Sequence, residues 1–121
     1  MTARLSTHVL DTSVGRPAVG VAITVRRVEP GGVPGELLVQ TVTNSDGRTD
    51  EPLLEGDQLS AGIYEICFSV GDYFAAASPS GSATGVAFLD VVPVRFGTDG
   101  TEHLHVPLLV TPWAYSTYRG S

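Results

Sequence analysis

The sequence predicts an all-β fold, a two-sheet antiparallel sandwich of about eight strands with one short helix. Helical periodicity is almost absent from the 121 residues, and short runs rich in Val, Ile, Thr and Tyr alternate with Gly, Pro, Asp and Ser. Apolar residues make up 42% of the chain, which is enough for a buried core in a domain of this length. We therefore expect residues 1–121 to form a single sandwich domain.

The strands follow from runs that end at turn signals such as SVGRP, PGGVPG, NSDGR, LSAG and FGTDGT. A weaker strand is expected near Pro52–Leu54. Residues 72–77 are expected to form one or two helical turns, and Ser78–Gly85 a mobile surface loop. The main strands are expected at Leu5–Asp11, Val19–Val28, Glu36–Asn44, Ile63–Val70, Phe88–Phe96, His103–Thr111 and Trp113–Tyr118.

The alternation of side chains within these runs predicts an unusual outer face. In the first strand Leu5, Thr7 and Val9 share one face, and in a strand every second residue points the same way. The opposite face is only partly polar, which is typical of an interface, so we expect a symmetric homo-oligomer. If the first strand and the two C-terminal strands share a sheet, its outer face carries His8, Leu10, His105, Leu109 and Tyr118.

Charge and cysteine content exclude several classes of function. The net charge is −6, from 7 basic and 13 acidic residues, so there is no basic field for nucleic acid or an anionic membrane. Cys67 is the single cysteine, which excludes a disulfide within the chain and a thiolate metal site. The start resembles no signal peptide and no run reaches transmembrane length, so a soluble, cytoplasmic protein is expected.

Two of the three histidines are candidates for chemistry. His103 follows an acidic turn and is interpreted as a surface residue. His8 and His105 fall on the expected outer face, and from the pattern alone they are as consistent with surface residues as with a shared site. A zinc site needs three or four ligands, and the chain has no HExxH or CxxC motif, so no metal is expected. A histidine pair acting as a general base is the simpler chemistry.

Two arginines are consistent with either a structural or a functional role. Arg48 follows the turn NSDG and is either a solvated turn residue or a clamp for a carbonyl or oxyanion. A guanidinium near an imidazole disfavours protonation of the ring, which keeps a base neutral near pH 7. Arg119, close to the C-terminus, has the same two interpretations. Asp11 is interpreted as a turn residue after the first strand.

Four segments together resemble the 5-hydroxyisourate hydrolase family, the transthyretin-related proteins of urate degradation. They are STHVLDTSVGRPAVGVAITV, TNSDGRTD, GIYEICFSVGDYF and HLHVPLLVTPWAYSTYRGS, and the resemblance runs from about Leu5 to Ser121. Many β-sandwich modules share the pattern of the middle segments. The final HVPLL and YSTYRGS, together with the histidine of STHVLD, are far more specific.

The resemblance implies a transthyretin-like sandwich that assembles as a homotetramer with active sites in a channel at the subunit interface. It implies hydrolysis of 5-hydroxyisourate, a cyclic amide, to 2-oxo-4-hydroxy-4-carboxy-5-ureidoimidazoline, with no cofactor and no metal. The residues it implies as catalytic are His8, His105, Arg48 and Ser121, and those it implies for substrate binding are His8, Arg48, Tyr118, Arg119 and Gly120.

Some positions depart from the family pattern. Trp113 and Ala114 stand where the family usually has Tyr and Gly, and the segment Ser78–Gly85 is longer than usual. None of these is a matched site residue, so they bear on the channel rim and the subunit packing. Two other functions are compatible with the fold: a carrier of small apolar ligands without catalysis, and a monomeric structural module.

Overall fold

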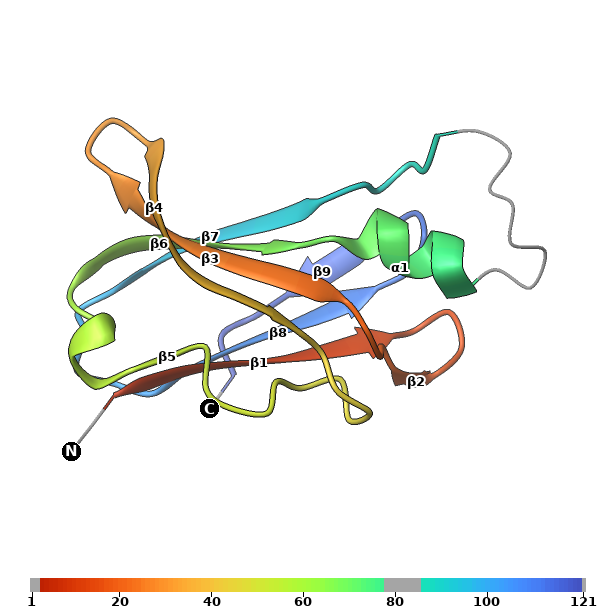
Figure 1. Cartoon of the computed structure of the whole chain (residues 1–121), viewed down its shortest axis with the longest axis horizontal. Coiled ribbons are helices and arrows are strands. Elements are labelled where there is room, and N and C mark those ends of the chain that lie inside the picture. The colour runs from red at the N-terminus through yellow and green to blue at the C-terminus, as the bar shows by residue number, and fades with distance from the viewer. Residues whose placement is uncertain (1–2, 78–85, 121) are drawn as a thin grey trace.

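The computed structural model describes residues 3–77 and 86–120, and these form the two facing layers of a β-sandwich (Figure 1). The expected fold class is confirmed. The expected mobile loop Ser78–Gly85 and the terminal Ser121 lie outside the described residues.

Nine strands of the described residues divide between two sheets. One sheet has the order β2-β1-β8-β9, and β5 also pairs with β1. The other has the order β4-β3-β6-β7. The first sheet contains β1 (Arg4–Asp11), β2 (Arg16–Pro17), β5 (Leu54–Glu55), β8 (Leu104–Val110) and β9 (Tyr115–Thr117). The second contains β3 (Ala22–Glu29), β4 (Val33–Val42), β6 (Gly62–Phe68) and β7 (Val92–Thr98).

One pairing departs from the antiparallel pattern. β1 and β8 run parallel, because the chain leaves β1, builds most of the opposite sheet and returns along β8 in the same direction. Parallel neighbours require such a long crossover connection. This pair lies in the middle of its sheet and positions the residues discussed below.

The core lies between the sheets and follows the expected alternation. In β1 Leu5, Thr7 and Val9 are buried, whereas the residues between them are half-buried. The matching face of β8 and the inward residues of β6 complete the core. The buried side chains of these two strands include Leu104, Val106, Leu108, Val110, Tyr64, Ile66 and Phe68.

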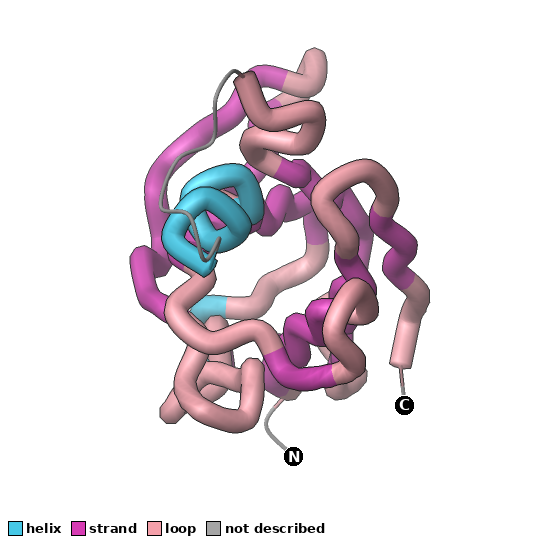
Figure 2. Tube along the Cα trace, turned by 90° about the vertical axis from the view of Figure 1, so that its right-hand side faces the viewer, coloured by secondary structure: helices cyan, strands magenta, loops and turns pink. Residues whose placement is uncertain are grey.

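The helix α1 (Val70–Ala77) covers one end of the sandwich, as Figure 2 shows from that end, and a short 3-10 helix spans Gly56–Gln58. Two expected boundaries are wrong here. The strand expected to run to Val70 stops at Phe68, because Val70 is the buried first residue of the helix. The strand expected from Phe88 starts only at Val92. The carbonyl of Asp90 accepts a hydrogen bond from Gly71 N–H, so the preceding segment contacts the helix instead of the sheet.

Asp11 contacts both the turn after β1 and the helix α1, so its interpretation as a turn residue is incomplete. The residue is 3% exposed, and its carboxylate accepts hydrogen bonds from the backbone N–H and the hydroxyl of Ser13. It also accepts one from the Tyr73 hydroxyl at 2.7 Å. Burial, followed by the hydrogen bond and charge of Asp11, raises the pKa of Tyr73 to about 12. Asp11 therefore ties α1 to the end of β1.

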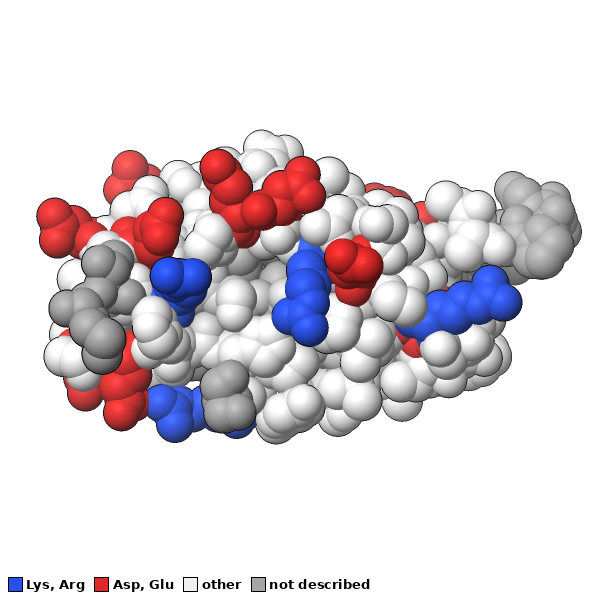
Figure 3. Space-filling model, turned by 90° about the horizontal axis from the view of Figure 1, so that it is seen from below, with Lys and Arg blue, Asp and Glu red and all other residues white. Residues whose placement is uncertain are grey.

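Among the described residues, no helix is both long and apolar enough to span a bilayer. Figure 3 shows the outer face of the sheet that contains β1 and β8. Its arginine side chains stand apart from one another, and acidic side chains gather along one edge and one end. The charged side chains are therefore unevenly distributed over this face.

Candidate active site

The parallel pairing of β1 and β8 brings the two candidate histidines to neighbouring strands. Ser6 is the register partner of His105, and His8 is the partner of Pro107. His8 and His105 are therefore diagonal neighbours on the outer face, and both are half-buried. The two histidines therefore lie on one face of the sheet, as the alternation of side chains predicts.

A tight turn over residues 44–48 carries Arg48 to the same place. The side-chain oxygen of Asn44 accepts hydrogen bonds from the backbone N–H of Asp46 at 2.9 Å and of Arg48 at 3.2 Å. Gly47, at φ 76°, donates its N–H to the Asn44 carbonyl, and its own carbonyl accepts the N–H of Val9 at 2.7 Å. The turn is thereby closed on itself and fastened to β1.

The glycine in this turn is required by space as well as by backbone conformation. A Cβ at Gly47 would lie 2.4 Å from the Val9 carbonyl oxygen and 3.3 Å from Cδ2 of His8. A positive φ is also unfavourable for residues with a side chain. The turn therefore packs against the His8 ring only because residue 47 has no side chain.

The contact of His8 with this turn assigns the proton of its neutral ring. Nε2 of His8 lies 2.9 Å from the backbone carbonyl oxygen of Asp46. A carbonyl oxygen only accepts hydrogen bonds, so Nε2 of His8 carries a hydrogen and donates. In the neutral ring the lone pair then lies on Nδ1.

His105 lies among groups that keep it neutral. Burial lowers the pKa of His105, and the positive charges of Arg48 and His8 lower it further. The guanidinium of Arg48 therefore lowers the pKa of His105, as expected from the sequence. Burial lowers that pKa more. Among the described residues Arg48 has no ion-pair partner, which leaves its charge uncompensated.

The C-terminal segment packs against the other side of His105. After β9 the chain returns, and Gly120 N–H donates to the His105 carbonyl at 2.7 Å. A Cβ at Gly120 would lie 2.7 Å from Cδ2 of His105, so any side chain there would collide with the ring. The close backbone approach expected of this glycine is therefore present.

The remaining candidates of this segment are less constrained. Tyr118 is 60% exposed. Arg119 forms an ion pair with Glu102, and both side chains are exposed. Glu102 lies shortly before the first residue of β8, so the guanidinium of Arg119 is near the start of that strand. Ser121 lies outside the described residues, and no contact is assigned to it. Nor do residues 3–77 and 86–120 contain a cluster of three or more metal-ligating His, Cys, Asp or Glu side chains.

Sequence reasoning missed Ser6, whose hydroxyl oxygen lies 2.9 Å from Nδ1 of His105. A serine in a strand gives no signal by itself, and only the register of β1 against β8 reveals the contact. Ser6 and His105 border a hollow of about 390 Å³ whose other lining residues are Arg4, His103 and Leu104.

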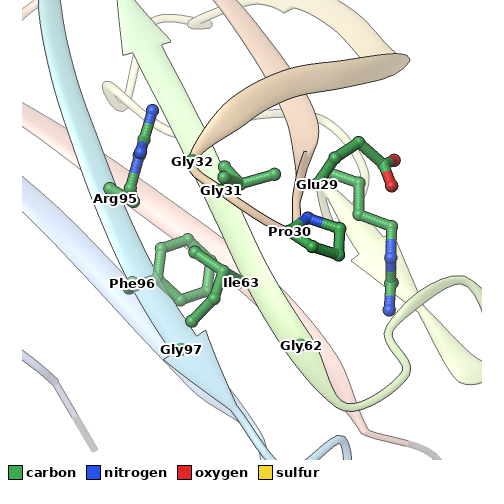
Figure 4. A pocket seen from close by; sticks show the side chains of 11 residues that line it. Glu29, Pro30, Gly31, Gly32, Gly62, Ile63, Arg95, Phe96 and Gly97 are labelled. Carbon is green, nitrogen blue, oxygen red and sulfur yellow. The ribbon is translucent and has the colours of Figure 1, made fainter.

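A larger hollow lies on the opposite sheet and contains none of the candidate residues. Its volume is about 720 Å³, and it lies beside the loop between β3 and β4 (Figure 4). Ile63 and Phe96 provide apolar surface there, and the turn at Pro30 to Gly32 forms one wall. It offers no imidazole, hydroxyl or thiol side chain among its lining residues.

The fold and the site together define a transthyretin-like sandwich with two imidazoles and a guanidinium on one outer face. The family described as HIUase/Transthyretin matches residues 5–120. This chain therefore belongs to the HIUase/Transthyretin family, and the resemblance drawn from its sequence motifs is confirmed.

Individual relatives agree with this assignment. The chain is 52% identical over 122 residues to a 5-hydroxyisourate hydrolase of Halalkalibacterium halodurans, and the match covers 100% of both chains. It is similar to the solved structure of Klebsiella pneumoniae 5-hydroxyisourate hydrolase, with a TM-score of 0.79, 35% identity and coverage of 98% and 99% of the two chains. It is also similar to a crystal structure of (S)-allantoin synthase, with a TM-score of 0.88 and 45% identity. In that case it covers 99% of its own length but 44% of the other chain.

Proposed function

We propose that this protein is an enzyme that hydrolyses 5-hydroxyisourate to 2-oxo-4-hydroxy-4-carboxy-5-ureidoimidazoline, as part of urate degradation. The observation that carries the proposal is the meeting of His8, His105 and Arg48 on one outer face, where burial and positive charge lower the pKa of His105. The names of the relatives support the choice of substrate. Perturbed titratable groups that converge in this way are typical of catalytic sites.

In the proposed reaction the histidine pair removes a proton from water. The water oxygen forms a bond to the carbonyl carbon of the cyclic amide, and one imidazole takes the proton. The C–N bond of the amide then breaks, and the proton passes to the departing nitrogen. One water is added in total, and no oxidant, metal or organic cofactor takes part. A neutral imidazole near the operating pH suits this role.

Arg48 is proposed to stabilise the negative charge that develops on the carbonyl oxygen. Loss of one such donor commonly lowers the rate by about 10²–10³. Tyr118, Arg119 and Gly120 are proposed to bind the planar substrate together with His8 and Arg48. Ser121 is proposed to take part in catalysis through its hydroxyl. Gly120 also contributes by packing against the His105 ring.

The active form is proposed to be a homotetramer with its sites at the subunit interface. Support comes from large side chains left exposed near β9, where Trp113 is 73% and Tyr118 60% exposed. Light scattering during size-exclusion chromatography should give about four times the chain mass of 12.7 kDa. A monomer at micromolar concentration would contradict this assembly and would favour the structural module.

We also propose that residues 1–121 act as a single domain in the cytoplasm. The location rests on the sequence alone and is checked by fractionating cells that produce the tagged protein. Recovery of the protein in another compartment would contradict it.

The activity is tested by following the ultraviolet absorbance of freshly made 5-hydroxyisourate, which also decays spontaneously. Addition of the protein is expected to accelerate that decay in proportion to its concentration. Tight binding of the compound without faster decay would favour the ligand carrier instead. No binding and no acceleration would reject both functions.

A further inference from the structure

We propose that Ser6 is a positioning residue that accepts a hydrogen bond from Nδ1–H of His105 and thereby leaves Nε2 of that ring as the basic nitrogen. The inference rests on the proposed function, because it assigns a role within the same site. Neither the family resemblance nor the relatives' names assign any part to this serine.

The first support is the register of the two central strands. Ser6 and His105 are direct partners in the parallel pairing of β1 with β8, and both are half-buried. The Ser6 hydroxyl oxygen lies 2.9 Å from Nδ1, a normal hydrogen-bond distance. A contact between register partners is fixed by the sheet itself and does not depend on a loop.

The second support is that the ring is held on both sides. Gly120 leaves no room for a side chain, since a Cβ there would lie 2.7 Å from Cδ2 of His105. Rotating the ring by 180° would exchange Nδ1 with Cδ2 and would place a carbon atom against the serine hydroxyl. The orientation with Nδ1 toward Ser6 is therefore favoured, and among the described residues the ring makes its side-chain hydrogen bond through Nδ1.

The direction of the hydrogen bond decides what His105 can do. A neutral imidazole has one N–H and one lone pair. If Ser6 donated to Nδ1, Nε2 would carry the hydrogen and could not accept a proton from water. If Ser6 accepts, Nε2 has the lone pair that a general base needs. The Ser6 hydroxyl hydrogen can then be donated to water, because the hollow of about 390 Å³ opens beside it.

The third support is the charge around the ring. A carboxylate partner would orient the imidazole equally well, but its negative charge would favour the imidazolium form. A serine orients the ring without adding charge, which fits the lowered pKa of His105. The titratable and charged groups that face this ring or share its hollow are Arg4 and His8 on β1, Arg48 in the 44–48 turn, and His103 beside β8.

The direct test is nitrogen NMR of the ¹⁵N-histidine-labelled protein, with the His105 signals assigned by their loss in His105→Gln. At a pH where the ring is neutral, we expect the hydrogen of His105 on Nδ1. Ser6→Ala should abolish this preference, and Ser6→Thr, which keeps the hydroxyl, should restore it. A hydrogen on Nε2 of the unaltered protein would overturn the proposal, and this readout needs no substrate.

The kinetic test asks whether the hydrogen bond matters for turnover. Ser6→Ala is expected to lower kcat about 10- to 100-fold with little change in KM, part of the 10²–10⁴ that a general base contributes. Ser6→Asp is expected to move the acidic limb of the pH profile upward, because a carboxylate favours the protonated ring. Ser6→Thr should recover most of kcat.

Ser69→Ala is the matched control, because Ser69 is also half-buried but lies between β6 and α1. It should leave kcat unchanged.

Unaltered kcat and pH profile in Ser6→Ala would overturn the role of Ser6, even with an active parent enzyme. An inactive parent enzyme would reject the proposed function. The tautomer of His105 measured by NMR would still show whether Ser6 accepts or donates the hydrogen bond. If Ser6→Ala fails to fold, the parent and Ser6→Thr spectra still provide the test.

Discussion

Two arginines, Arg95 on one sheet and Arg48 beside the other, differ in whether their charge is paired. On the face of β3, β6 and β7, Arg95 makes an ion pair with Glu65 at 3.0 Å, and the hollow of about 720 Å³ lies beside it. On the face of β1 and β8, Arg48 has no ion-pair partner among the described residues, and its charge lowers the pKa of His105. The smaller hollow of about 390 Å³ is bordered by the imidazole of His105, whereas the hollow beside Arg95 has no imidazole among its lining residues.

The largest expected effect comes from the histidines. His105→Ala and His8→Ala should each lower turnover of 5-hydroxyisourate by about 10²–10⁴, the range typical of a lost general base. The oligomer should remain intact by size-exclusion chromatography, because both side chains are only half-buried. Unchanged turnover in both variants would refute the pair as the base.

The second largest effect is expected from the loss of Arg48. Arg48→Ala should lower kcat by about 10²–10³, the cost typical of one lost oxyanion donor. It should also move the acidic limb of the pH profile upward, because a positive charge near His105 is removed. Arg95→Ala removes the same charge from the other face and should leave both quantities unchanged. Equal losses in the two variants would contradict a special role for Arg48.

A smaller effect is expected from the turn that holds Arg48 against β1. Gly47→Ala should lower stability by more than about 1–2 kcal/mol and reduce turnover, because the new Cβ collides with β1 in addition to the strained φ. Gly15→Ala is the matched control, with φ 69° against 76° and no atom within 4 Å of the new Cβ. Chemical denaturation and steady-state kinetics measure both. Similar losses of stability would mean that the contact with β1 is unimportant.

The smallest effect is expected from the ion pair of Arg119 with Glu102. Both side chains are exposed, so Glu102→Gln should change stability by at most about 1 kcal/mol. Because Arg119 is proposed to contact substrate, freeing it from Glu102 should alter KM more than kcat. A large loss of stability would show that the pair is structural.

The parts of this site that a sequence can predict are those set by periodicity. Alternation predicts that His8 and His105 lie on the outer faces of their strands, and it places them on one shared face on the condition that these strands lie in one sheet. Ser6 and the buried role of Asp11 were not foreseen, because they depend on register and packing between elements far apart in the chain. The late start of β7 was missed for the same reason, since Gly71 of the helix holds the segment before it.

The central claim is that a histidine pair beside Arg48, in which His105 is neutral near pH 7, performs the hydrolysis. It is tested most directly by the pH dependence of kcat/KM on freshly made 5-hydroxyisourate. Because the pKa of His105 is lowered from its usual value near 6.5, the ring stays neutral through pH 7. Activity should therefore be constant from pH 8 to 7 and fall only when the pH drops below about 6.5. A flat profile from pH 5 to 8, or no acceleration at any pH, would contradict the account.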